Sequence, residues 1–150
     1  MSNVYTFPSR EAMRVGTQGS VWLMKNNKMA PTVLKIHNEQ RAYAIEQMCY
    51  MRLRDYGVTH LEGFHVPLLI HCERETLVLE MTMVRPPYLL DFAQAYLDSP
   101  PDYSEEVWAE TRARWSAAYG DEWPRVQRVL AAMEELGIYY EDVHRGNLAL

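Results

Sequence analysis

The sequence has few cysteines, no excess of basic residues and no long apolar run, and each absence excludes a class of protein. Its two cysteines, Cys49 and Cys72, form no Cys-x-x-Cys pattern, which argues against a zinc site or a disulfide framework. A formal charge of −5 gives no basic surface for nucleic acid. No run approaches the roughly 18 apolar residues of a membrane span, and residues 1–10 lack the apolar core of a signal peptide. We therefore expect a cytoplasmic protein without membrane association.

The remaining composition is typical of a folded domain. Hydrophobic residues make up 48% of the 150 positions and charged residues 23%, the balance of a globular rather than a disordered chain. A chain of this length can bury a hydrophobic core of its own.

The order of the local patterns predicts an α+β fold. Short β-favouring runs and polar turns predict two hairpins, at 21–24 with 32–36 and at 66–71 with 76–80. Apolar residues spaced by three and four predict helices, and a shorter helix is expected after Pro86-Pro87. The expected helices span 39–56, 89–97, 105–119 and 125–136. Strands with one helix come first and helices follow, so we expect a sheet-containing part at 1–84 and a helical part at 85–150.

A glycine-rich segment is the first of four groups that could act together in phosphoryl transfer. Gly16-Thr17-Gln18-Gly19-Ser20-Val21 lies between two expected strands. Glycines let backbone N–H groups approach phosphate oxygens without an intervening Cβ atom. Two glycines between strands are more often only a turn, and that interpretation stays open.

Lys35, the second group, stands in the middle of an expected strand. An outward-facing lysine is the simpler interpretation, because an unpaired buried charge is costly. If Lys35 instead lies beneath the glycine-rich turn, it can contact phosphates and needs a carboxylate to orient it. Glu39 and Glu46 of the next helix are the candidates, and we prefer Glu46 because it lies further into the helix.

The third group is the apolar run Leu77-Val78-Leu79-Glu80-Met81. Backbone groups where this strand ends, at Glu80 and Met81, could bind the edge of an adenine ring. A buried strand without any ligand explains the run equally well.

The fourth group is the most specific, a loop that reads Tyr140-Glu141-Asp142-Val143-His144-Arg145-Gly146-Asn147 before an apolar end. Asp142 could accept the proton of an attacking hydroxyl group. Asn147, five residues later, could bind a magnesium ion through its side-chain oxygen. An aspartate and an asparagine at this spacing are common, but Asp-Val-His-x-Gly-Asn before an apolar strand is far less so.

This loop resembles the catalytic loop of the protein-kinase-like superfamily, particularly its aminoglycoside and choline kinase branch, which has Asp-Leu-His-Pro-Gly-Asn here. The other groups follow in the order of that family. The resemblance implies an N-lobe, made of a small antiparallel sheet plus one helix, followed by the first helices and catalytic loop of a C-lobe. It also implies a site for ATP and Mg²⁺. In that site Asp142 is the catalytic base, Asn147 a metal ligand, and the nucleotide contacts are Gly16, Gly19, Val21, Lys35, Glu46, Glu80 and Met81.

Departures from the family pattern bear on activity. Arg14 stands where the first glycine of the loop is expected, and Tyr140-Glu141 replaces the usual His-Arg or His-Gly pair. Arg145 replaces a proline. The sequence ends at Leu150, before the place of the metal-binding aspartate of the family. We therefore expect weak or absent magnesium binding and no phosphotransfer by these 150 residues alone.

Two functions of different classes follow from this resemblance. The first is an ATP-binding kinase-like domain, which acts as a phosphotransferase if a complete C-lobe exists. Its phosphate acceptor stays open among protein hydroxyl, sugar, choline and aminoglycoside. The second is a non-catalytic, pseudokinase-type interaction module. A structural protein with coincidental motifs is the remaining alternative.

The expected helix at 125–136 has an apolar stripe that later helices would cover in that family. Burying apolar surface is worth about 25 cal/mol per Å², so an exposed stripe is destabilising. We expect either self-association into a homo-oligomer through this stripe, or folding of the tryptophan-bearing segment 102–123 over it. The stripe consists of Val126, Val129, Leu130, Met133 and Leu136.

Overall fold

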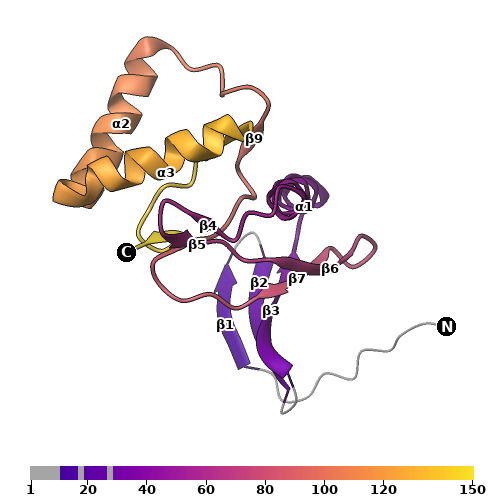
Figure 1. The fold of residues 1–150 in the computed structure, drawn as a ribbon. Coiled ribbons are helices and arrows are strands. Elements are labelled where there is room, and N and C mark those ends of the chain that lie inside the picture. Colours follow the sequence, from indigo (N-terminus) through magenta and orange to yellow (C-terminus); the bar gives the residue numbers. More distant parts are fainter. Residues whose placement is uncertain (1–10, 17–18, 27–28) are drawn as a thin grey trace.

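Residues 11–16, 19–26 and 29–150 are described by the computed structural model, and within these ranges the chain has an α+β fold (Figure 1). Five of its strands form an antiparallel sheet in the order β1-β2-β3-β7-β6. The strand bounds are β1 (Glu11–Gly16), β2 (Gly19–Asn26), β3 (Met29–His37), β6 (Leu69–Glu73) and β7 (Val78–Thr82). The α+β class expected from the sequence is confirmed.

Both expected hairpins are present in this sheet. β2 pairs with β3, with Val21 opposite Lys35, and β6 pairs with β7. The second hairpin begins later than expected, because the residues around Val66 belong to the segment that leads from α1 (Gln40–Asp55) to β6. The N–H group of Val66 donates to the carbonyl of Thr59 at 2.9 Å. Pairing with β7 begins next to Leu68, whose carbonyl accepts from the N–H group of Thr82 at 3.0 Å, and its register starts at Leu69.

One helix, α1 (Gln40–Asp55), packs against this sheet through contacts with β3, β6 and β7. Its buried side chains recur at intervals of three and four residues, which places them on one face. Gly57 follows the helix in the left-handed region, at a φ of 69°, as is common after a helix end. The helix expected at 39–56 is confirmed. Its buried residues are Tyr43, Glu46, Cys49, Tyr50 and Leu53.

A second sheet joins the early and late parts of the chain. Within the described ranges its order is β11-β8-β5-β4, with β5 and β8 parallel and the other pairs antiparallel. Strands from 60–65 therefore pair, through β8, with the last residues of the sequence. The bounds are β4 (His60–Leu61), β5 (Phe64–His65), β8 (Tyr88–Leu89) and β11 (Leu148–Ala149), and a separate pair is formed by β9 (Tyr96–Leu97) and β10 (Ile138–Tyr139).

The helix expected at 89–97 is wrong. Leu89 pairs with Leu148 in the second sheet, and the N–H group of Leu90 donates to the carbonyl of Asn147 at 2.7 Å. Asp91 then adopts a φ of 64°, which a right-handed helix cannot contain. Hydrogen bonds to the end of the chain override the local apolar pattern here.

The two later helices, α2 (Glu105–Tyr119) and α3 (Trp123–Glu135), are joined by the short 3-10 helix η1 (Gly120–Glu122). The side chain of Ser104 caps α2 by accepting from the N–H of Val107 at 3.3 Å. Both helices were expected and are confirmed. Figure 1 shows them lying together, away from β1, β2 and β3. No helix among the described residues is long and apolar enough to cross a membrane.

The apolar stripe of α3 is largely covered by other parts of the chain. Val126, Val129 and Met133 have no exposed surface, and α2 and η1 contact α3 directly. The rings of Trp115 and Trp123 lie 6.4 Å apart at this contact. Segment 102–123 covers part of the stripe, and β10 and β4 also contact α3, while Leu130 and Leu136 stay partly exposed. Self-association through this face stays a prediction.

Candidate functional site

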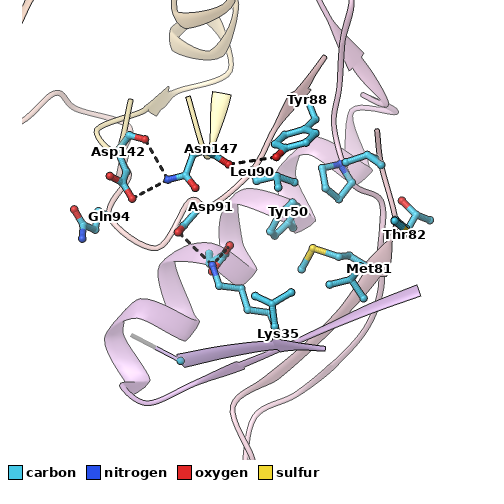
Figure 2. A pocket seen from close by; sticks show the side chains of 18 residues that line it. Lys35, Tyr50, Met81, Thr82, Tyr88, Leu90, Asp91, Gln94, Asp142 and Asn147 are labelled. Atoms are coloured by element: carbon cyan, nitrogen blue, oxygen red, sulfur yellow. Dashed lines mark hydrogen bonds and ion pairs between the residues drawn. The ribbon is translucent and has the colours of Figure 1, made fainter. Parts of the chain in front are cut away.

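One cavity of about 500 Å³ brings together distant parts of the chain (Figure 2). Its volume is in the range of small-molecule binding sites. The walls come from β2, β3, α1, the end of β7, the segment 82–94 and the loop 142–147. The lining includes these residues selected from the sequence: Gly19, Val21, Lys35, Glu46, Met81, Asp142 and Asn147.

Lys35 on β3 lies in this cavity and is bound by the carboxylate of Glu46 on α1. Its Nζ lies 2.8 Å from Oε1 and 2.7 Å from Oε2 of Glu46. Burial by itself lowers the pKa of Lys35, but the carboxylates of Glu46 and Asp91 outweigh burial, so the pKa is raised. Lys35 therefore keeps its positive charge at neutral pH. Glu39, the other candidate, is exposed and precedes the helix.

Glu46 has further partners besides Lys35. The Nε2 of His37 lies 2.6 Å from Oε2, and the N–H group of Phe92 donates to Oε1 at 3.3 Å. The side chains of Glu46 and His37 have no exposed surface, and a buried carboxylate needs such partners. The sequence interpretation missed His37. The signal was available, since residues two apart on a strand share a face and His37 follows Lys35 by two.

Asp91 is a second carboxylate at Lys35 that the sequence interpretation also missed. Its Oδ1 lies 3.2 Å from Nζ of Lys35, and Figure 2 shows it between Lys35 and the loop that contains Asn147. The N–H group of Ala93 donates to the same oxygen at 3.2 Å. A single aspartate inside the apolar run 88–93 was the signal, comparable to a lysine inside an apolar strand.

The loop with Asp142 and Asn147 forms the wall facing Lys35. The Nδ2 of Asn147 donates to Oδ2 of Asp142 at 2.8 Å and to its carbonyl at 3.3 Å. Asn147 is only 1% exposed. The phenol of Tyr140 donates to the carbonyl of Leu90, and that of Tyr119 to the carbonyl of Leu148 at 2.8 Å. The loop is thus held at both ends, with Asp142 directed at the cavity (Figure 2).

The end of β7 supplies an apolar side of the cavity. Met81 and the residues that follow it, up to Val84, line this side. Glu80 does not contribute its side chain, because its Oε1 accepts a hydrogen bond from the hydroxyl of Thr32 at 2.9 Å. Of the two residues selected at this strand end, the structure places Met81 in the cavity and directs the carboxylate of Glu80 to β3.

The glycine-rich segment is described only in part. Gly16 ends β1 opposite Gly19 on β2, and Thr17 and Gln18 lie outside the described residues. A Cβ atom on Gly19 would lie 2.0 Å from the carbonyl oxygen of Ile36, so no larger residue fits there. Close contact with β3 therefore accounts for this glycine without any ligand.

A metal ion would find few ligands in the protein. Among the residues that the structure describes, no three His, Cys, Asp or Glu side chains are grouped to hold a metal. Asn147 lies at the cavity beside Asp142, and an amide oxygen is a ligand that suits Mg²⁺. Asn147 fits a cation that takes its other ligands from a bound phosphate and from water.

Comparisons with known proteins give no assignment. No protein-family model matches the chain, and no curated protein matches it. The geometry of the cavity is therefore the basis for a functional proposal.

Proposed function

We propose that this cavity is the nucleotide site of a protein-kinase-like domain and that it binds a nucleoside triphosphate. The observation that carries the proposal is the position of Lys35, which is oriented by Glu46 of α1 and faces the loop of Asp142 and Asn147 across one cavity. These residues come from separate elements, and phosphoryl transfer needs their chemistry in one place.

The lining of the cavity supports this ligand class. One side is apolar, as a purine ring requires, and the other has Lys35, Asp142 and Asn147, the groups expected around phosphates. The apolar side is lined by Val21, Val33, Met81, Val84 and Leu90.

The chain's own residues have distinct roles in this proposal. Lys35 binds phosphate oxygens, and Glu46 fixes the direction of Lys35. Asn147 holds Mg²⁺ through its side-chain oxygen, and Asp142 receives the proton of an acceptor hydroxyl group. The metal ion, when bound, neutralises charge on the phosphates. The chemical class of the acceptor follows from none of these residues.

A non-catalytic module, of the pseudokinase type, is the alternative function. The observation in its favour is that Lys35 already has two carboxylate partners, Glu46 and Asp91. Such a cluster satisfies its charges without a ligand. In this alternative the fold serves for contact with a partner rather than for phosphoryl transfer.

A thermal-shift experiment separates these functions. The melting temperature is measured with ATP and with ATP plus Mg²⁺, for the parent, for Lys35→Met and for the control Lys25→Ala, an exposed lysine on β2. A ligand at 100 times its dissociation constant stabilises by about 2.7 kcal/mol. A magnesium-dependent shift in the parent and the control that is lost in Lys35→Met supports the proposed nucleotide site with a bound metal ion.

The other outcomes have equally direct meanings. A shift that does not depend on magnesium supports the non-catalytic module with a nucleotide in its cavity. An absence of any shift in the parent, at millimolar ATP with and without magnesium, contradicts the proposed nucleotide site.

A further inference from the structure

His37 is buried with both of its ring nitrogens against oxygen atoms. Nε2 lies 2.6 Å from Oε2 of Glu46, and Nδ1 lies 3.2 Å from the carbonyl oxygen of Leu77. The side chain has no exposed surface, so water cannot take the place of either partner. Oε1 of Glu46 accepts from Lys35 and from the N–H group of Phe92, and Oε2 lies 2.7 Å from Nζ of Lys35, so both oxygens face donors.

This geometry favours a ring with two protons. A carbonyl and a carboxylate carry no proton to donate, so both ring nitrogens must donate if both contacts are hydrogen bonds. Only the imidazolium form has a proton on each nitrogen. A neutral ring would direct a lone pair at one of the two oxygens, which is costly in a buried place.

The second proton on His37 changes the net charge of the cluster formed by Lys35, His37, Glu46 and Asp91. With a protonated His37, the positive charges of Lys35 and His37 balance the negative charges of Glu46 and Asp91. Without that proton, the same four side chains carry one net negative charge. Phosphates approaching Lys35 then meet a negative cluster, whose repulsion is strong because the site is largely buried.

We propose that His37 is a positioning residue that supplies the second positive charge of the phosphate site. By binding one oxygen of Glu46, it offsets the charge of this carboxylate, so that the cluster around Lys35 is neutral rather than negative where phosphates approach. The inference rests on the proposed nucleotide function, and it makes phosphate binding sensitive to pH. Nucleotide affinity is highest at acidic pH and falls as His37 loses its proton.

The groups that face His37 come from several elements of the described structure. Glu46 lies on α1, and so does Tyr43, whose ring packs edge-on against the imidazole with centroids 5.6 Å apart. Lys35 lies on the same strand, and Leu77 contributes its carbonyl from the turn before β7. Asp91 acts through Lys35. Of the side-chain types in this set, histidine is the one whose unperturbed charge change falls between about pH 5 and 8.

Calorimetric titration with ATP tests the inference. Dissociation constants are measured from pH 5.5 to 8.5 for the parent, for His37→Gln and for the control His60→Gln, which alters an exposed histidine on β4. Glutamine keeps a donor for Glu46 but has no charge. From the strength of one partly buried charge, we expect the parent and the control to lose on the order of tenfold in affinity across this range. Relative to them, His37→Gln binds weakly throughout, and its affinity changes less with pH, the remaining change being that of the terminal phosphate of ATP, whose own pKa is about 6.

A second measurement reads the proton directly and needs no ligand. Nitrogen-15 NMR of the ring nitrogens, assigned by the signals missing in His37→Gln, distinguishes a doubly from a singly protonated ring. Two protonated nitrogens at pH 6, replaced by one at higher pH, support the inference. One protonated nitrogen at pH 5.5 overturns it.

The outcomes distinguish the inference from the proposed function. If the parent and His37→Gln bind ATP with the same pH dependence, the role of His37 is wrong and the nucleotide site stands. If the parent binds no ATP at any pH, the nucleotide function is wrong, and the role of His37 in phosphate binding is wrong with it.

Discussion

Asp91 places its Oδ1 3.2 Å from the Nζ of Lys35, from a backbone whose φ of 64° is in the left-handed region. Non-glycine residues adopt that region at some cost, although aspartate does so more readily than most. The surrounding structure maintains this backbone conformation, because the N–H group of the preceding residue, Leu90, donates to the carbonyl of Asn147. Asp91 thus occupies an anion position beside Lys35.

Replacing this carboxylate by a neutral isostere should open the anion position. We predict that Asp91→Asn binds magnesium-free ATP about tenfold more tightly than the parent, because one negative charge beside Lys35 is removed. Asp98→Asn is the matched control, since Asp98 also has a positive φ, of 66°, but pairs with Arg52 outside the cavity. Calorimetric titration without magnesium measures both. Weaker binding by Asp91→Asn would contradict the idea that the carboxylate of Asp91 competes with a phosphate for Lys35.

Glu46 is the centre of the buried polar cluster, so its removal should lower the stability of the whole fold. We predict that Glu46→Ala lowers the free energy of unfolding by about 3–5 kcal/mol, because it leaves Lys35 buried without its closest partner. Glu46→Gln should cost less, since it retains an acceptor oxygen. Glu39→Ala, at an exposed position before α1, should change stability very little. Urea denaturation measures the free energy of unfolding of all three variants. Equal losses of stability for Glu39→Ala and Glu46→Ala would contradict the central role of Glu46 in the cluster.

Gly137 lies where the early and late parts of the chain meet. A Cβ atom there would lie 2.7 Å from Oδ1 of Asp98 and 2.8 Å from Nη1 of Arg52, two atoms that form an ion pair. Gly57 also has a positive φ, but a Cβ atom on it meets nothing within 4 Å. We predict that Gly57→Ala costs roughly 1 kcal/mol from backbone strain alone. Gly137→Ala should cost more, because it also displaces the ion pair. Thermal denaturation that ranks the two variants in the opposite order would contradict this packing.

Glu141, beside Asp142, should make stability depend on pH. Burial raises the pKa of Glu141, and the hydrogen bond from Tyr103 offsets this only in part. A carboxyl whose pKa is raised by folding stabilises the fold at acidic pH and loses that contribution as the pH rises through the raised value. We therefore predict that Glu141→Gln melts at a modestly higher temperature than the parent at pH 7. The two should melt alike near pH 3, where the parent carboxyl is also neutral.

The control for this prediction is Glu110→Gln, an exposed glutamate on α2. It should leave the difference in melting temperature between pH 3 and pH 7 as it is in the parent. A Glu141→Gln protein that is less stable than the parent at pH 7 would show that the ionised form of Glu141 is favoured by folding.

Local patterns predicted the regular elements because side-chain spacing decides which face of a strand or helix is buried. The hairpin around Lys35, the helix that contains Glu46 and the late helices α2 and α3 all follow from such spacing. The same reasoning failed at Asp91, where it predicted a helix. The backbone there is determined by pairing with Leu148 and Asn147, residues distant in the chain, and no local pattern carries that information.

The amino-acid order alone was enough to predict both hairpins, the helix that contains Glu46 and the late helices α2 and α3, but not the backbone at 89–97. Tertiary packing alone decided that Lys35, Asp91 and the loop of Asp142 and Asn147 share one cavity, and that His37 and Lys35 share one carboxylate. The physical reason is the range of the interactions. Periodicity acts over a few neighbouring residues, whereas the charge balance of a buried cluster depends on every element that meets there.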